Sequence, residues 1–325
     1  MKTAFVTGGT GFIGVNLVDQ LVRQSWSVTC LHREGSELRY LKRHPVELRV
    51  GDLLDADSLR RAIPQGVNTV FHVAADTSSW SRLDAGQTAT NVTGTRNVVN
   101  AARERGAKRF VLTSTASAYG PQKGPLSEES PSTAATSWVN YERSKWLSEQ
   151  EVRQGSRNGL SAVIMNPCAV FGPCDTSVWG QVFRSIRDGK MAVLPPGALP
   201  VNHVTEVARA HIAAAQRGSD GANYILNGEY HTLAEIFRQM ARLLGVELRA
   251  PVLPRTVFKT LARCVAMAAS LTGKTPEMTP EMAEILSRDN RVVTDRAERE
   301  LDYHRVPLEQ CLRDSYDWLK AEGLL

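Results

Sequence analysis

The chain has 325 residues, of which 42% are apolar and 22% charged, and its formal net charge is +5. This length allows one large domain or two coupled ones, and the composition is ordinary for a soluble enzyme. No run of five like charges occurs, so nothing beyond a basic pI supports nucleic-acid binding. The five cysteines form no CxxC pair and no metal-like grouping with histidine, and their odd number favours free thiols.

The first half of the chain alternates strand-like and helix-like stretches. Ile13, Leu17 and Leu21 recur at a spacing of four, which predicts an amphipathic helix directly after the first strand. Further helices are expected over 58–62, 93–103 and 141–152, and strands over 4–7, 27–31, 46–50, 70–73, 110–113 and 162–165. Short apolar strands separated by helices favour parallel pairing with both faces of the sheet covered. The sequence therefore predicts an α/β fold, a doubly wound parallel sheet that binds ligands at the carboxyl ends of its strands.

The alternation weakens after residue 170, where prolines cluster. A helix over 206–216 and a strand over 223–226 still suit the large sheet. The remaining predicted elements are helices over 233–244, 255–274, 280–287 and 308–322. We predict a dinucleotide-binding Rossmann domain and a smaller, mostly helical substrate lobe. The first would contain residues 1–170 plus 201–228, and the second residues 171–200 plus 229–325.

Membrane association has one candidate segment. No stretch reaches eighteen uninterrupted apolar residues, the length that a membrane-spanning helix needs. A secretory leader has a long apolar region near its start, whereas here a short strand and a glycine loop follow Lys2. Residues 255–274 are helix-like, apolar over much of their surface and interrupted by Lys259 and Arg263. This segment could make a weak peripheral contact with a membrane surface, or it packs as a helix over the substrate end of the protein. We expect a cytoplasmic protein.

A glycine-rich loop follows the first predicted strand. Gly8, Gly11 and Gly14 form the pattern G-x-x-G-x-x-G and open the next helix, a spacing that differs from the more familiar G-x-G-x-x-G. Small residues allow the backbone to approach a pyrophosphate, whose charge the free N–H groups of a helix N-terminus stabilise. Strand, glycine loop and helix in this order predict a dinucleotide site.

The end of the second predicted strand bears on the choice of cofactor. A site that prefers NAD usually has a carboxylate here for the ribose 2′-hydroxyl. This chain has Arg33 instead, which favours the 2′-phosphate of NADP through charge and paired hydrogen bonds. Glu34 follows directly, so NAD stays possible. Asp52, after the third strand, either accepts a hydrogen bond from the adenine amino group or caps the helix that begins near Asp55.

Tyr141 and Lys145 are four residues apart and share one face of a predicted helix. A free phenol has a pKa of about 10, and a nearby ammonium lowers that pKa by stabilising the phenolate. The helix falls between two core strands of a dinucleotide fold, which favours an active site over a solvated surface. Ser114 and Thr115 belong to several hydroxyl residues that follow the preceding strand, where one of them would hydrogen-bond a substrate oxygen.

Three further motifs occur along the chain. Residues 71–75 read Phe-His-Val-Ala-Ala, residues 166–173 read Asn-Pro-Cys-Ala-Val-Phe-Gly-Pro, and residues 202–208 read Asn-His-Val-Thr-Glu-Val-Ala. The chain thus resembles the extended short-chain dehydrogenase/reductases, the NAD-dependent epimerase/dehydratase superfamily. Within it, the chain is most similar to the dihydroflavonol-4-reductase-like and 3β-hydroxysteroid-dehydrogenase-like branch. The resemblance covers nearly the whole chain.

The resemblance implies roles by position. Thr115 would be the catalytic hydroxyl, with Ser114 as its near rival. Tyr141 would donate or accept a proton, and Lys145 would tune Tyr141 and bind the nicotinamide ribose. The residues expected to bind the cofactor are Gly8, Gly11, Phe12, Ile13, Gly14, Arg33, Asp52, Leu53, Val73, Ala74, Ala75, Tyr141, Lys145, Pro167 and Val170. No metal site is expected. Relatives often pair the helices near 93–103 and 141–152, which implies a homodimer.

We expect an oxidoreductase in which NADPH reduces a substrate carbonyl, or NADP oxidises the matching alcohol. Tyr141 would protonate the carbonyl oxygen and Thr115 would polarise it. The tryptophans at 80, 138 and 179 lie in loops expected near the mouth of the crevice. Trp80, Trp138 and Trp179 would suit an apolar or ring-bearing substrate, although packing at a domain junction explains them about as well.

Two alternatives stay open. A nucleotide-sugar epimerase or dehydratase with tightly bound NAD would need cations for the substrate diphosphate. Such relatives usually carry an arginine just before the counterpart of Asn202, but residues 197–201 contain no basic residue. Arg184, Arg187 and Lys190 could replace it. The second alternative is a non-catalytic NADP-binding sensor, although such relatives typically lose the tyrosine or the lysine that this chain keeps.

Overall fold

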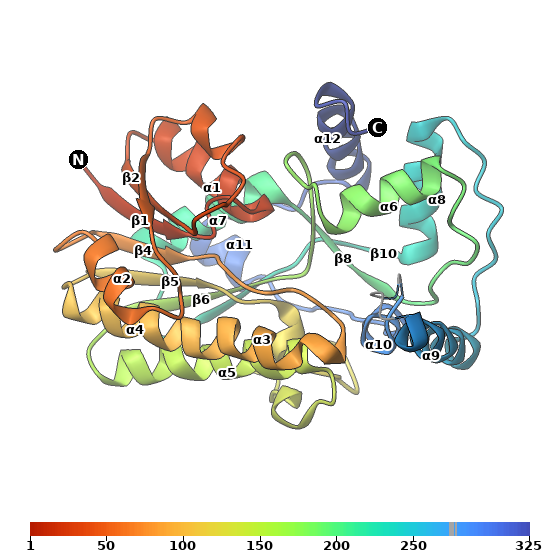
Figure 1. The fold of residues 1–325 in the computed structure, drawn as a ribbon, viewed down its shortest axis with the longest axis horizontal. Coiled ribbons are helices and arrows are strands. Elements are labelled where there is room, and N and C mark those ends of the chain that lie inside the picture. Colours follow the sequence, from red (N-terminus) through yellow and green to blue (C-terminus); the bar gives the residue numbers. More distant parts are fainter. Residues whose placement is uncertain (273–275, 277) are drawn as a thin grey trace.

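Seven parallel strands form the larger sheet of the structure, a computed structural model that describes residues 1–272, 276 and 278–325. Their order is β3-β2-β1-β4-β5-β6-β9, and they lie in the half of the molecule that holds the N-terminus (Figure 1). The strands are β1 (Thr3–Thr7), β2 (Ser27–His32), β3 (Glu47–Val50), β4 (Thr69–His72), β5 (Arg109–Thr113), β6 (Ala162–Pro167) and β9 (Asn223–Leu226). The strand order reverses at β1, which creates a crevice at the carboxyl ends. The predicted doubly wound sheet is confirmed.

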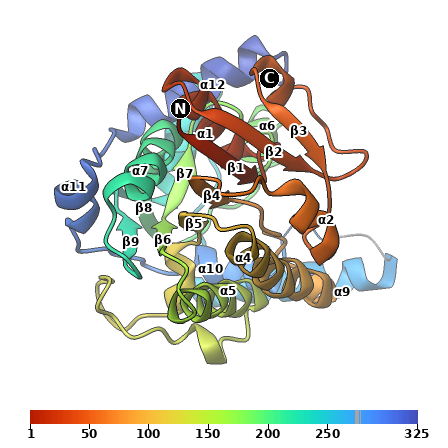
Figure 2. The ribbon, with the colours of Figure 1, turned by 90° about the vertical axis from the view of Figure 1, so that its left-hand side faces the viewer.

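Helices cover both faces of this sheet (Figure 2). One face carries α1 (Phe12–Arg23) and α7 (Val204–Arg217), and the other carries α2 (Ala56–Ala62), α4 (Gly94–Glu104) and α5 (Asn140–Arg157). A strand that is buried from both sides needs apolar residues at consecutive positions. This requirement explains why the central strands read as short continuous apolar runs.

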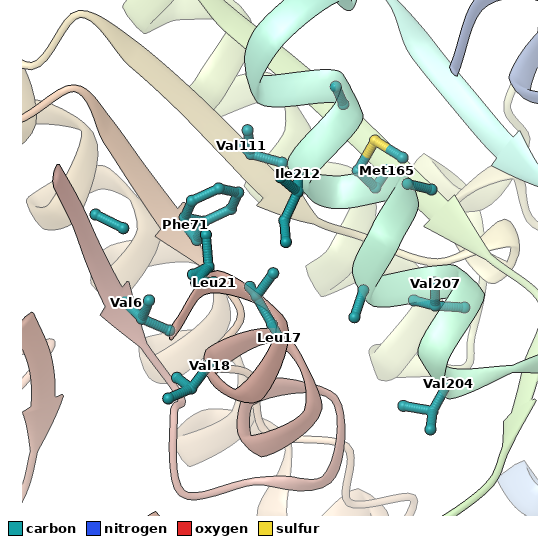
Figure 3. Close-up of a cluster of buried hydrophobic side chains, with 14 of the residues drawn as sticks. Val6, Leu17, Val18, Leu21, Phe71, Val111, Met165, Val204, Val207 and Ile212 are labelled. Carbon is teal, nitrogen blue, oxygen red and sulfur yellow. The ribbon is translucent and has the colours of Figure 1, made fainter. Parts of the chain in front are cut away.

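Apolar side chains of α1, α7 and the sheet form one buried cluster (Figure 3). Leu17 and Leu21 of α1, Ile212 of α7 and Phe71 of β4 are all buried there. Burying one such side chain stabilises the fold by about 1.5–3 kcal/mol. Ile13 was expected on the same face, and it packs against the cluster. It also lines a cavity at the edge of the sheet, because it lies in the first turn of α1.

The helix predicted over 93–103 is part of a longer helical segment. A short helix, α3 (Asp84–Thr88), leads through a π-helical turn (Ala89–Thr93) directly into α4. The next helix, α5, extends beyond the predicted 141–152 at both ends. Single π-helical turns are rare and frequently occur near functional sites.

A second sheet, which the sequence did not predict, lies beside the first. Its strands β7 (Ala169–Phe171), β8 (Ala198–His203) and β10 (Glu229–Thr232) are arranged in the order β10-β8-β7. The helices around it are α6 (Val178–Arg187), α8 (Leu233–Leu244), α9 (Arg255–Thr272), α10 (Pro280–Leu286) and α12 (Leu308–Ala321). They form the right-hand half of Figure 1. These strands pair with segments about 30 residues away, and β7 and β10 are also short, so local patterns did not reveal them.

The exact division into two domains stays a proposal. Residues from α6, α8, β8 and α12 share an apolar cluster of their own, which supports a separate lobe. The short helix α11 (Arg296–Leu301) instead buries Ala297 and Leu301 in the cluster of the larger sheet. Packing therefore associates this part of 229–325 with the nucleotide-binding half.

The segment predicted as a helix over 255–274 contains α9, which ends at Thr272, while residues 273 and 274 lie outside the described residues. In the described part of the chain, no helix is long and apolar enough to cross a membrane. All five cysteines lie within that part, and each is a free thiol.

Candidate active site

A cavity of about 900 Å³ follows the carboxyl ends of the large sheet and extends to the second lobe. Its walls combine the glycine loop, the ends of β2, β4, β5 and β6, the first turn of α5, and residues of α6 and α10. Every residue predicted to bind cofactor lines this cavity except Lys145. A crevice at this edge of a doubly wound sheet is where such folds bind their ligands.

The glycine loop has the geometry of a phosphate cradle. Gly8 has a φ of +73°, and a Cβ atom on it would lie 2.5 Å from the backbone nitrogen of Ala74. A Cβ on Gly14 would lie 2.0 Å from the carbonyl oxygen of Gly8. Gly11 is the N-cap of α1, and no side chain of the described residues caps this helix end. The first N–H groups of α1 therefore remain available for an anion, so this loop fits a dinucleotide pyrophosphate.

The ends of β2 and β3 place Arg33 and Asp52 in the cavity wall. The Arg33 side chain is exposed, and it forms no ion pair within residues 1–272, 276 and 278–325. Asp55, not Asp52, caps α2 by accepting hydrogen bonds from the backbone nitrogens of Asp57 and Ser58. The Asp52 carboxylate accepts only from the Leu54 nitrogen, at 2.8 Å, among the described groups. Helix capping is thus excluded for Asp52, and a contact with adenine stays a prediction.

Thr115 and Tyr141 line the cavity, and Lys145 is buried behind its wall, one turn after Tyr141 in α5. Burial raises the pKa of Tyr141 to about 12, while a hydrogen bond with Thr115 lowers it and Glu142 raises it. The Lys145 ammonium is buried and donates a hydrogen bond of 2.9 Å to the carbonyl oxygen of Thr113. Burial lowers the pKa of Lys145 to about 8, and Glu149 opposes this shift. The Tyr141 phenol therefore stays protonated at neutral pH and can donate a proton, while Lys145 is not among the described groups that shift the pKa of this phenol.

Two neighbouring hydroxyls at the end of β5 have different partners. The Ser114 hydroxyl donates to the Glu149 carboxylate at 2.5 Å, in the protein interior. The Thr115 hydroxyl interacts with the Tyr141 phenol and also accepts a hydrogen bond from the Ser117 nitrogen at 3.2 Å. This geometry favours Thr115 over Ser114 as the group that would meet a substrate oxygen.

Buried polar residues behind the site were not predicted. His72 lies between the hydroxyls of Thr7, at 2.7 Å, and Thr95, at 3.0 Å, and burial followed by the Lys145 charge lowers its pKa to about 3. Asn91, in the π-helical turn, donates to the Ser144 hydroxyl at 3.0 Å. The contacts of His72 with Thr7 and of Asn91 with Ser144 join residues more than 50 positions apart, so no local sequence signal marked them.

The three tryptophans expected near the crevice have separate environments. Trp179 lines the cavity and stacks on Phe171 with ring centroids 4.4 Å apart. Trp80 lies outside the described cavity lining, with the Arg82 guanidinium 5.2 Å from its ring. Trp138 is 53% exposed just before α5 and also lies outside that lining. The structure therefore brings only one of the three into the cavity.

Residues far along the chain complete the apolar end of the cavity. Met282, Ile285 and Leu286 of α10 line it opposite Trp179 and Val178 of α6. The sequence predicted the helix that carries these α10 residues. It could not place that helix at a cavity whose wall also contains the ends of β5 and β6, more than 100 residues earlier.

A known protein family matches more than half of the chain. A model of the NAD dependent epimerase/dehydratase family matches residues 4–227. The chain belongs to this family. The match includes the glycine loop, Arg33, Asp52, Thr115, Tyr141 and Lys145. Family membership confirms the resemblance seen in the sequence and makes the protein an NAD(P)-dependent oxidoreductase.

Several family members resemble the chain over nearly its whole length. A Synechocystis protein, provisionally named dihydroflavonol 4-reductase, is 31% identical over 98% of this chain and 95% of its own. The 2-alkyl-3-oxoalkanoate reductase of Stenotrophomonas maltophilia is 30% identical over 95% of this chain and 96% of its own. The crystal structure of gox2253 has a TM-score of 0.87 at 31% identity and covers 100% of both chains.

Proposed function

We propose that the protein uses NADPH to reduce a carbonyl group of a small apolar or ring-bearing substrate, or NADP to oxidise the matching alcohol. One observation carries this proposal. Tyr141 and Thr115 line the same cavity as the glycine loop and residues of α6 and α10, and Lys145 is buried one turn after Tyr141 in α5. A carbonyl bound there would face both a proton donor and a hydrogen-bond donor.

Thr115, Tyr141 and Lys145 would each have a different role in the reaction. A bound nicotinamide supplies or accepts the hydride in this reaction class. Tyr141 gives a proton to the carbonyl oxygen as negative charge develops on it, and Thr115 polarises the same oxygen through a hydrogen bond. The Lys145 ammonium stabilises the tyrosinate that remains, and the Thr113 carbonyl holds that ammonium in place. The same groups act in reverse when an alcohol is oxidised.

The lining of the outer cavity supports an apolar substrate. Val178, Trp179, Met282, Ile285 and Leu286 supply aliphatic and aromatic surface there. Such walls bind ligands mainly through burial of apolar area, while a few polar groups set the orientation. The relative from Stenotrophomonas is named for a 2-alkyl-3-oxoalkanoate, a ketone that carries alkyl chains and a carboxylate, and its alkyl part agrees with this substrate class.

The nucleotide-sugar alternative has weaker support. Among the described residues that line the cavity, Arg33 carries the one guanidinium or ammonium group, and it lies at the end of β2. The cations proposed as substitutes have other partners: Arg184 donates to the Thr176 carbonyl, and Arg187 and Lys190 both pair with Asp188. A substrate diphosphate would therefore lack a paired cation at the outer end. A purely sensory role is disfavoured because Tyr141 and Lys145 are both present.

Replacing Arg33 with alanine tests the cofactor preference. We expect the wild-type protein to bind NADPH more tightly than NADH, and R33A to lose about 10- to 100-fold of its NADPH affinity, because hydrogen bonds to a charged group contribute about 1.5–3 kcal/mol. Fluorescence titrations with both cofactors measure this. Arg39→Ala is the control, since Arg39 pairs with Glu322 outside the cavity. Equal affinity of the wild type for NADH would contradict the assignment of Arg33.

Helix α9 supports a weak contact with anionic membrane surfaces. Its outer face exposes Val257, Leu261 and Met267, which are 49%, 36% and 70% exposed, and residues 255–272 contain cations but no acidic side chain. Exposed apolar residues beside basic ones are typical of interfacial helices.

We expect the protein to sediment with vesicles that contain anionic phospholipid, and V257E/L261E to remove this binding without changing the melting temperature. Val293→Glu, at an exposed apolar residue elsewhere, is the control. Binding that survives V257E/L261E would contradict the contact through α9.

Dimer formation and cytoplasmic location stay proposals. Pairing of α4 and α5 with a second copy rests on the family resemblance, and light scattering of the purified protein tests it. The free thiols support a reducing compartment.

A further inference from the structure

A buried carboxylate lies behind the proposed active site. Glu149 follows Lys145 by one turn of α5 and is buried. One of its oxygens accepts hydrogen bonds from the Ser114 hydroxyl at 2.5 Å and from the Asn166 amide at 2.7 Å. The other accepts from the Asn223 amide at 3.2 Å, and the Arg153 guanidinium lies 3.8 Å away. Glu149 does not line the cavity, so it would act through the groups that it holds.

The partners of Glu149 fix the strand ends that form the cavity wall. The Asn166 amide that binds Glu149 also donates to the carbonyl oxygen of Thr115, at 3.0 Å. The Ser114 nitrogen donates to the Met165 carbonyl at 2.7 Å, which ties the same segment to β6. The hydroxyls of Ser114 and Thr115 therefore have different partners: the first binds Glu149, and the second interacts with Tyr141.

We propose that Glu149 is a positioning residue that binds the Ser114 hydroxyl, holds the Thr115 backbone through Asn166, and supplies a buried counter-charge for Lys145. This inference rests on the proposed function, because it assigns Thr115 rather than Ser114 to the substrate oxygen. Buried polar groups that are fully hydrogen-bonded specify one arrangement of their surroundings, since any other leaves a partner unsatisfied.

The charge of Glu149 should affect how the activity of the enzyme depends on pH. Lys145 and Arg153 on the same helix are the cations near Glu149, and the phenol of Tyr119 feels its charge from the turn after β5. The neutral His72 side chain faces Lys145 from β4. Glu149 raises the pKa of Lys145 against the effect of burial, so its neutralisation would lower that pKa further below about 8. If protonated Lys145 supports turnover, the alkaline loss of activity then moves to lower pH.

The test compares Glu149→Gln with Glu151→Gln on the same helix. Glu151 pairs with the exposed Arg96 and faces away from the site, so its substitution controls for loss of a carboxylate from α5. We expect E149Q to lower kcat on the order of 10- to 100-fold, as for a misplaced catalytic group, with NADPH affinity within about threefold of wild type. The alkaline limb of its pH profile should shift downward, and E151Q should match wild type in every respect.

Three further variants keep the inference testable if E149Q does not fold. Glu149→Asp retains the charge but withdraws the carboxylate by one methylene, so we expect a lower kcat with an unshifted alkaline limb. Ser114→Ala should lower kcat less than Thr115→Ala does. An E149Q enzyme indistinguishable from E151Q, or an S114A enzyme as impaired as T115A, would overturn the proposal.

A crystal structure of E149Q gives a readout that needs no turnover. We expect the Ser114 hydroxyl to be released and the Thr115 hydroxyl to move away from Tyr141. An unchanged Thr115 would overturn the positioning role even if no substrate were found. Absence of turnover by the wild type on a broad ketone panel would instead count against the proposed function alone.

Discussion

Tyr141→Phe is expected to lower kcat by about 10²- to 10⁴-fold, which is the usual contribution of a positioned general acid or base. The phenol lines the cavity, a hydrogen bond with Thr115 affects its pKa, and Lys145 follows it by one turn of α5. Phenylalanine keeps the ring and its packing but has no proton to transfer. The measurement is NADPH consumption with a panel of apolar ketones, followed by absorbance.

Binding and folding controls separate this effect from a general defect. Tyr141→Phe should bind NADPH as the wild type does, because the glycine loop and Arg33 are unchanged. Tyr230→Phe, which removes a hydroxyl bonded to Asp289 outside the cavity lining, should retain full activity. Normal turnover by Y141F would refute the assigned proton donor. Tight cofactor binding by the wild type without turnover on any ketone would favour a sensor.

Gly14→Ala is expected to weaken NADPH binding by roughly 100-fold, or about 2.7 kcal/mol. Alanine normally stabilises a helix relative to glycine, so propensity alone predicts a gain. The added Cβ would lie 2.0 Å from the Gly8 carbonyl oxygen, however, and the loop must move to avoid it. Because that loop forms the phosphate cradle, its displacement should lower both cofactor affinity and the melting temperature.

Gly11→Ala is the matched control for folding. Its Cβ would lie 3.4 Å from the same carbonyl oxygen, which is an ordinary contact, so the unliganded protein should melt close to the wild-type temperature. Differential scanning calorimetry without cofactor compares the two variants, and fluorescence titration gives the affinities. A Gly14→Ala protein as stable as wild type, with unchanged affinity, would show that the loop tolerates the clash.

Local sequence patterns were sufficient for the large sheet and its helices. Its central strands contain short apolar runs, such as residues 4–6 of β1 and 110–112 of β5, and the helix from Phe12 has apolar residues at a spacing of four. Both periodicities are properties of consecutive residues, so they can be read without a structure. The smaller sheet was missed because β7 and β10 are short and all three of its strands pair across intervals of about 30 residues.

Some features of the candidate site could likewise be predicted from local sequence patterns, and others could not. The sequence by itself determined the family, the glycine loop and the Tyr141–Lys145 pair, because each depends on spacing within a single turn, loop or helix. Only the tertiary structure decided that Ser114 binds Glu149 while Thr115 meets Tyr141. It also decided that Trp179, and not Trp80 or Trp138, faces the cavity with residues of α10. The direction of a side chain depends on partners brought close by folding, and such partners leave no periodic pattern in the chain.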